Sequence, residues 1–239
     1  MRVLRLLVAY DGTRFCGWQR QENGPTIQAA IEDALLPFSD RTIGGQVVPP
    51  TVFGAGRTDA GVHALGQVAS VQIGTQHPVE SIRRALNVQL DRDIRVLEVT
   101  DAREGFNARF DAVGKTYRYR IATSEVVSPF AHRYVWHQPQ PLDVKAMQAA
   151  TPALVGRHDF SAFMSSGSDV LDTFRTVDRA DLTVSGDELV FEVHGDGFLR
   201  HMVRAIVGTL VDIGTGRRDP GSVLPCYDGR QLMQLRYRR

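Results

Sequence analysis

The sequence predicts an α+β protein made of two successive halves, each with the element order β-α-β-β-α-β. Strand and helix patterns occur in this order twice along the 239 residues, and the second half repeats the order without repeating the sequence. We expect two tandem ferredoxin-like halves, over residues 1–105 and 106–239, with antiparallel sheets joined across a central cleft.

The first half begins with a strand pattern over residues 2–10, followed by the turn signal DGT. In TIQAAIEDALLPF, apolar residues at helical spacing follow Thr26, which is a suitable N-cap. A strand runs into Val52 and Phe53, and residues 67–73 alternate as a half-buried strand does. A helix in VESIRRALNVQL and a strand at IRVLEVT complete this half.

The second half begins with a strand at KTYRYRI. A helix follows in LDVKAMQAATPALV, and we expect Pro152 to kink it or end it early. Two strands come next, near TFRTVDRADLTV and ELVFEVHG. Residues 198–214, FLRHMVRAIVGTLVDIG, predict the strongest helix of the chain, and QLMQLRY is the expected closing strand.

Composition and charge are those of a globular protein, with 43% hydrophobic and 23% charged residues. The net charge of +1 predicts no general affinity for polyanions, so a nucleic-acid site depends on where the charges lie. The two cysteines, Cys16 and Cys226, form neither a metal-ligand spacing nor a disulfide framework, and no apolar run reaches membrane-spanning length. We therefore expect a cytoplasmic protein without a membrane segment.

The stretch GAGRTDAGVHALG, residues 54–66, places Arg57, Asp59 and His63 in a frame of four glycines. Glycine allows positive φ and close backbone approach to a ligand, which favours a functional loop. The alternative is a turn in which Asp59 bonds its own backbone and Arg57 is solvated. The loop alone leaves both interpretations open.

Four further motifs accompany this loop: YDGTRFCGWQRQ, FNARFDAVGKTYRYRI, GRHDFSAF and GDGFLRHMVRAIVGTL. In this order, from about Val8 to Gly214, the set closely resembles the TruA family of tRNA pseudouridine synthases, and GRTDAGVHA is its most specific fragment. The resemblance implies an isomerase that converts uridine to pseudouridine in the anticodon stem-loop of tRNA, at positions 38 to 40, with no cofactor and no metal. It also implies a homodimer in which one tRNA spans both subunits.

The resemblance assigns the catalytic roles. Asp59 matches the family's nucleophile, although attack on ribose C1′, attack on uracil C6 and elimination to a glycal-type intermediate all remain open. Arg57 matches the arginine that keeps this carboxylate charged and fills the space left by the flipped nucleotide. Tyr117 matches the tyrosine that stacks on uracil, and its phenol is a candidate for moving the C5 proton. We expect Tyr119 on the other face of the strand, as a structural control.

Phosphate contacts are expected from arginines. On the helix predicted from residue 198, Arg200 and Arg204 are four residues apart and form a basic stripe, for which a merely solvated face is the alternative. By resemblance of their motifs, the further contact candidates are Arg14, Gln19, Arg20 and Arg118.

The chain departs from the family pattern at two places. Asn107 stands where the family usually has histidine, and because asparagine does not titrate near neutral pH we expect a positional role. Near the C-terminus a family segment is missing, so that Gly229 and Arg230 fall on the positions of a glycine and of a leucine that packs on the uracil. We expect a more open pocket there.

Two other classes compete with this interpretation. Tandem ferredoxin-like units can be non-catalytic RNA-binding modules, but the consensus RNA-recognition stretch with its sheet aromatics is missing here. A metal-dependent hydrolase would have to use His194, Asp196 and His201, without paired ligand spacing elsewhere.

Overall fold

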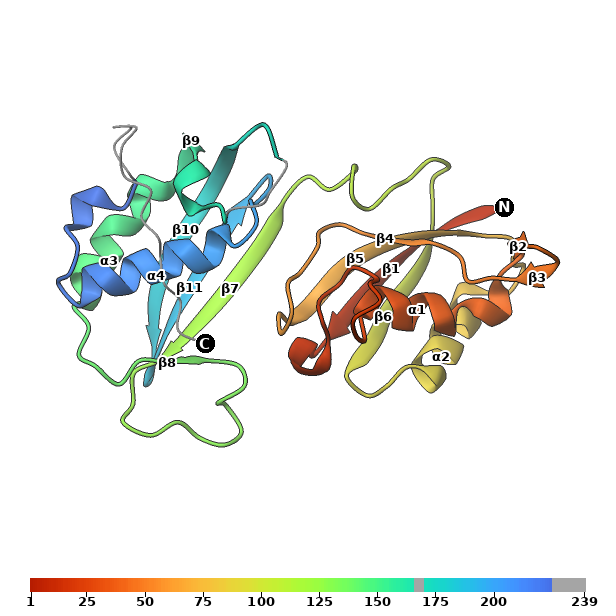
Figure 1. Cartoon of the computed structure of the whole chain (residues 1–239), viewed down its shortest axis with the longest axis horizontal. Helices are drawn as coiled ribbons and strands as arrows, with labels where there is room; N and C mark the ends of the chain where they lie inside the picture. The colour runs from red at the N-terminus through yellow and green to blue at the C-terminus, as the bar shows by residue number, and fades with distance from the viewer. Residues whose placement is uncertain (166–169, 225–239) are drawn as a thin grey trace. The chain divides into compact units, whose positions relative to one another are not determined.

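The computed structural model describes residues 1–165 and 170–224, and the chain divides into two compact units, Met1–Ala112 and Val113–Arg239 (Figure 1). The division comes later than the boundary expected after residue 105, because the following segment attaches to the first unit. There the Ala108 N–H donates to Ser70 Oγ at 3.0 Å, and both residues are buried. Each unit has its own hydrophobic core.

The first unit is a four-stranded antiparallel sheet in the order β4-β5-β1-β6, with helices on one face (Figure 1). A short hairpin, which the sequence patterns did not predict, precedes β4. The elements are β1 (Arg2–Tyr10), α1 (Ile27–Ala34), β2 (Thr42–Ile43), β3 (Gln46–Val47), β4 (Val52–Gly54), β5 (Ala64–Ile73), α2 (Val79–Gln89) and β6 (Ile94–Ala102).

Side-chain alternation explains the core of this unit. Leu4, Leu6 and Val8 of β1 are fully buried on the helix side of the sheet, while the residues between them are half-buried on the opposite face. Helix α1 begins as predicted, because the Thr26 side chain accepts a hydrogen bond from the Ala29 N–H at 3.3 Å.

The second unit is a five-stranded sheet in the order β8-β7-β11-β10-β9, with α3 and α4 on one face (Figure 1). Helix α3 ends before Pro152, which confirms the expected early end; a 3-10 turn continues it. The two short strands β8 and β9 were not predicted. The elements are β7 (Lys115–Ala122), β8 (Trp136–His137), α3 (Val144–Ala150), β9 (Gly156–Asp159), β10 (Phe174–Ser185), β11 (Glu188–Gly195) and α4 (Met202–Gly214).

Helix α4 begins at Met202, so the prediction of a helix from residue 198 is wrong for its first turn. The reason is His201, whose φ of 63° is left-handed and cannot continue a right-handed helix. Arg200 therefore lies in the turn before the helix, and only Arg204 lies on it. The expected closing strand QLMQLRY lies outside the described residues.

The architecture confirms the predicted α+β class, with antiparallel pairing throughout the first sheet and between β7, β11, β10 and β9 in the second. In residues 1–165 and 170–224, no helix is both long and apolar enough to cross a membrane.

Candidate active site

The glycine-rich stretch forms the loop between β4 and β5, so two neighbouring strands of the first sheet hold its ends. Within the loop, the Val62 N–H donates to the Asp59 carbonyl at 3.2 Å and closes a turn. Asp59 is half-buried and Arg57 is exposed. The aspartate therefore lies on a short turn at the edge of a rigid sheet.

A second loop, residues 10–18, holds this turn from outside. Tyr10 OH and Thr58 Oγ1 are hydrogen-bonded at 2.9 Å, and the Trp18 N–H donates to the Thr58 carbonyl at 3.0 Å. The Gly12 N–H donates to His63 Nδ1 at 3.1 Å. These bonds fix the residue directly before Asp59 and the end of its turn.

The two loops approach so closely that glycine is required at two positions. A Cβ at Gly17 would lie 2.5 Å from the Thr58 carbonyl oxygen, and φ at this residue is +100°. A Cβ at Gly12 would overlap the carbonyl oxygen of Val62. Since any larger residue would push the loops apart, these glycines set the position of the Asp59 turn.

A buried polar network fixes the strand that enters this turn. Glu32, 5% exposed on α1, accepts hydrogen bonds from the Val52 N–H at 2.9 Å, from Gln28 Nε2 at 2.8 Å and from Arg20 Nε at 2.6 Å. Gln28 Oε1 in turn accepts from Gln19 Nε2 at 2.7 Å. A buried carboxylate with three donors is well satisfied, so the network joins α1 and β4 to the residues that directly follow the second loop.

Gln19 and Arg20, expected as tRNA contacts, thus have a place in the fold of the first unit. Burial lowers the pKa of Arg20, but the hydrogen bonds to Asp33 and Glu32 together raise it by more. The pKa of Arg20 is therefore raised. Glu32 and Gln28 were not predicted from the sequence as members of the site. A usable signal was present, because polar residues four apart on the buried side of an amphipathic helix indicate a buried network.

In the second unit, Tyr117 lies on β7 with its ring edge-to-face against Phe198, at a centroid distance of 5.0 Å and an angle of 74°. Tyr119 lies two residues further on and packs edge-to-face on Trp136 at 6.3 Å. Both tyrosines contact the same core, so the expectation that Tyr119 points to the other face is wrong. Side chains alternate along a strand, and residues two apart share a face.

A strained residue directly before α4 has an exposed arginine on each side, Arg200 in the turn and Arg204 in the first turn of the helix. His201 is the only non-glycine residue with positive φ in the described part of the chain. Such a conformation costs of order 1 kcal/mol or more and is frequent at functional sites. Arg200 and Arg204 flank it, and burial raises the pKa of Tyr119 while the charge of Arg204 lowers it, so Arg204 acts on the tyrosine side of the sheet.

The arginines expected to contact phosphate fall into two groups. Arg14 pairs with Asp91 and Asp93, at 2.9 Å and 2.6 Å, and Arg118 pairs with Glu192 at 2.9 Å. Hydrogen bonds to Asp91 and Asp93 raise the pKa of Arg14. By contrast, no described residue forms an ion pair with the members of the second group, which are Arg200 and Arg204.

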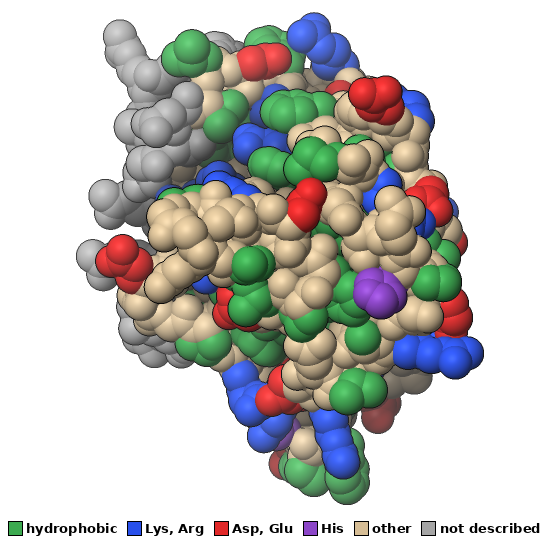
Figure 2. Space-filling model, turned by 90° about the vertical axis from the view of Figure 1, so that its right-hand side faces the viewer, with side chains coloured by type: hydrophobic (Ala, Val, Ile, Leu, Met, Phe, Trp, Pro, Cys, Tyr) green, Lys and Arg blue, Asp and Glu red, His purple; other side chains and the backbone are tan. Residues whose placement is uncertain are grey.

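Charges elsewhere are mixed. Figure 2 shows a face on which acidic and basic side chains are interspersed, in keeping with the net charge of +1. A positive field therefore has to come from local groups of unpaired arginines.

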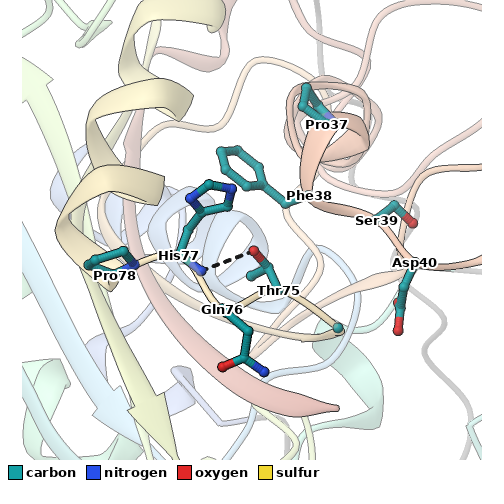
Figure 3. A pocket seen from close by; sticks show the side chains of 9 residues that line it. Pro37, Phe38, Ser39, Asp40, Thr75, Gln76, His77 and Pro78 are labelled. Carbon is teal, nitrogen blue, oxygen red and sulfur yellow. Dashed lines mark hydrogen bonds between the residues drawn. The ribbon is translucent and has the colours of Figure 1, made fainter.

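The structure also contains an open hollow of about 380 Å³, lined by residues 37–40 and 74–78 (Figure 3). Phe38 and His77 face each other in it, edge-to-face at 5.5 Å. It lies beyond the end of β5 remote from the Asp59 turn, roughly 30 Å along a ten-residue strand. It is therefore separate from the turn that holds Asp59.

The structure thus describes two clusters, each within one unit. In the first, Asp59 and Arg57 share the turn that residues 10–18 hold. In the second, Tyr117 and Phe198 lie beside the turn of Arg200. Gly229 and Arg230 lie outside the described residues. No three His, Cys, Asp and Glu side chains among those described lie close enough together to hold a metal ion, and His194 instead bonds Thr116 Oγ1 at 3.0 Å.

Comparison with known proteins gives consistent matches along nearly the whole chain. The model of a family described as tRNA pseudouridine synthase matches residues 6–111 and 150–237. A "tRNA pseudouridine synthase A" from Latilactobacillus sakei is 41% identical over 97% of this chain and 92% of its own length. The corresponding protein of Solibacter usitatus is 44% identical over 96% and 94%. A chain from the crystal structure of a Cbf5-Nop10-Gar1 complex is more distant, with 12% identity and a TM-score of 0.39 over 87% of this chain and 45% of that one.

Proposed function

Because this chain belongs to the tRNA pseudouridine synthase family, we propose that it acts at positions 38 to 40 of the anticodon stem-loop, with Asp59 as its nucleophile. The protein is an isomerase that converts uridine in tRNA to pseudouridine. The observation that carries the assignment of Asp59 is its place on a turn that a second loop fixes on both sides through Thr58 and His63.

The reaction needs a carboxylate and no redox partner. The bond between uracil N1 and ribose C1′ breaks, the base rotates, and C5 forms the new bond to C1′; the C5 proton leaves and N1 gains one. An ionised Asp59 can attack C1′ or C6 covalently, or promote elimination to a glycal-type intermediate. All three routes require the Asp59 carboxylate, and Arg57, two residues away on the same turn, is proposed to fill the space that the flipped nucleotide leaves.

Tyr117 is proposed as the stacking partner of the flipped uracil. Unstacking costs a few kcal/mol, and an aromatic platform returns about 1–3 kcal/mol. The edge of Phe198 against Tyr117 supports this role, because it restrains the ring before a base arrives. The phenol is also the proposed group for moving the C5 proton.

Phosphate binding is proposed first for Arg200 and Arg204, which have no carboxylate partner among the described residues. An unpaired guanidinium can take a phosphate without giving up an ion pair. The candidates of second rank are already bonded within the chain: Arg14, Gln19, Arg20 and Arg118.

Replacing both Arg200 and Arg204 by alanine is expected to weaken tRNA binding and to lower the slope of log Kd against log salt by about two, since fewer counterions are released. A fluorescence titration of labelled tRNA at several salt concentrations measures this slope. The control replaces the ion pair Arg120–Glu188 by two glutamines, which removes an already neutralised arginine and should leave the slope unchanged. An unchanged slope in the first variant would mean that these arginines are only solvated.

The target position is tested by incubating the purified protein with unmodified tRNA transcripts and mapping pseudouridine by carbodiimide labelling and primer extension. We expect modification at positions 38 to 40 and at no other uridine. Modification confined to another arm would overturn the proposed target while leaving the family activity intact.

The arrangement of the molecule completes the proposal. We propose that each half is ferredoxin-like. The strand order β4-β5-β1-β6 supports this for the first half, because β5 lies between β1 and β4 and pairs antiparallel with both. We propose a cytoplasmic homodimer on which one tRNA contacts both subunits. Sedimentation of the protein with and without tRNA measures the oligomeric state.

A further inference from the structure

The segment that follows β6 forms a turn held by several hydrogen bonds. Asn107 Oδ1 accepts from the Arg109 N–H at 2.9 Å, and the Asn107 N–H donates to Asp111 Oδ2 at 2.7 Å. Arg103 Nη2 donates to the other oxygen of Asp111 at 2.5 Å. Asn107, where the family usually has histidine, thus has a positional role here, in line with the expectation for an amide at this place.

This turn is anchored to the sheet of the first unit. Ala108, 2% exposed, donates its N–H to Ser70 Oγ on β5, and Ser70 is itself 2% exposed. The anchor and the Asn107 bonds fix the backbone on either side of the two residues that follow. The position of Arg109 and Phe110 is therefore set by the fold of the unit.

Arg109 and Phe110 are nevertheless presented to solvent. Phe110 is 80% exposed, and the guanidinium carbon of Arg109 lies over its ring, 5.8 Å from the centroid. No described carboxylate pairs with Arg109, so its charge is not neutralised. Single exposed apolar side chains are common on protein surfaces, so exposure alone does not indicate a binding role. What sets Phe110 apart is the guanidinium over its ring together with the hydrogen bonds that fix its turn.

We propose that Arg109 and Phe110 form a nucleotide-binding element, in which the Phe110 ring stacks on an unpaired base of the RNA substrate and Arg109 binds a neighbouring phosphate. The ligand chemistry follows from the pair: an aromatic face accepts any base, and a guanidinium beside it accepts the charge of the sugar-phosphate chain. Arg109 occupies one face of the ring and leaves the other for the base. The inference rests on the proposed function, because the ligand is the tRNA.

The element would add a contact from a segment other than the Asp59 turn. Hydrogen bonds fix the backbone of this turn, so little conformational entropy is lost when the base stacks. They also fix the position of the contact relative to the first sheet. It would therefore hold the substrate in register while the target uridine leaves its own stack.

The test measures Kd for an unmodified tRNA transcript in an Asp59→Asn background, so that binding is read without turnover. Phe110→Ala is expected to weaken binding about 5- to 150-fold, the range for loss of one base stack, whereas Phe110→Tyr retains it. Arg109→Ala is expected to lower the salt slope by about one. Phe130→Ala is the control, because Phe130 is 90% exposed without an arginine over its ring, and its Kd is expected to stay unchanged.

Two results would overturn the proposal. One is an unchanged Kd in Phe110→Ala. The other is a loss of affinity in Phe110→Ala that comes with a lower midpoint of thermal unfolding, or with an altered sedimentation coefficient, and that Phe110→Tyr does not rescue; the ring would then pack against protein. If Asp59→Asn stays active, the nucleophile assignment fails, but the comparison of Kd values between the Phe110 and Phe130 variants is unaffected.

Discussion

Asp59→Asn is expected to abolish pseudouridine formation, with a loss of turnover of at least about 10⁴-fold, while fold and tRNA affinity stay close to those of the parent. Asparagine fills the same space and leaves the backbone bonds of the turn in place, but it cannot act as a carboxylate nucleophile. Release of tritium from [5-³H]uridine-labelled tRNA measures turnover, and thermal unfolding and a tRNA titration measure the rest.

Asp59→Ala is the companion variant, because slow deamidation of asparagine could restore some aspartate. Asp101→Asn is the matched control: this exposed carboxylate pairs with Arg2 at the far end of β6 and takes no part in the proposed chemistry. Substantial turnover by purified Asp59→Ala would remove Asp59 from the mechanism and leave the clamped turn as a structural device.

Tyr117→Ala is expected to lower turnover by about 10²-fold or more, because it removes both the stacking surface and the phenol. Tyr117→Phe separates the two roles: it keeps the ring on Phe198, so tRNA binding should persist, and it removes the oxygen that would move the C5 proton. Single-turnover kinetics distinguish a slow chemical step from weak binding.

Tyr119→Ala is the control for this prediction. Tyr119 shares the face of β7 with Tyr117 but packs on Trp136, so its loss should mainly lower the free energy of unfolding, by about 2–4 kcal/mol. Both variants are compared at a temperature where each is folded. An equal loss of turnover in Tyr117→Ala and Tyr119→Ala would contradict the prediction that Tyr117 alone stacks on the substrate base.

The sequence predicted those helix ends that depend on interactions between residues close together in the chain. The Thr26 N-cap and the end of α3 before Pro152 depend on residues within one turn of each other, and both are confirmed. The start of α4 could not be found in this way, because the apolar spacing of residues 198–202 continues through the left-handed His201. The face of Tyr119 could have been predicted correctly, because residues two apart on a strand lie on the same face.

The pairing of the arginines is a different matter. Arg14 meets Asp93 across 79 positions of sequence, and Arg118 meets Glu192 across 74, so only the strand order brings them together. The sequence shows which residues are charged, but it does not show which of these charges are neutralised by an ion pair. The same holds for Glu32, whose carboxylate reaches Val52, twenty positions away.

The close approach of the loops around Gly12 and Gly17 bears on how genetics would describe this protein. A screen for inactive alleles would return substitutions at both glycines beside those at Asp59, since a methyl group at either one collides with the backbone that carries the aspartate. Neither glycine has a side chain with which to take part in the reaction. A map of positions that tolerate no substitution would therefore include the residues that position Asp59 as well as Asp59 itself. Only a measurement of turnover by folded protein would distinguish a positioning residue from the nucleophile.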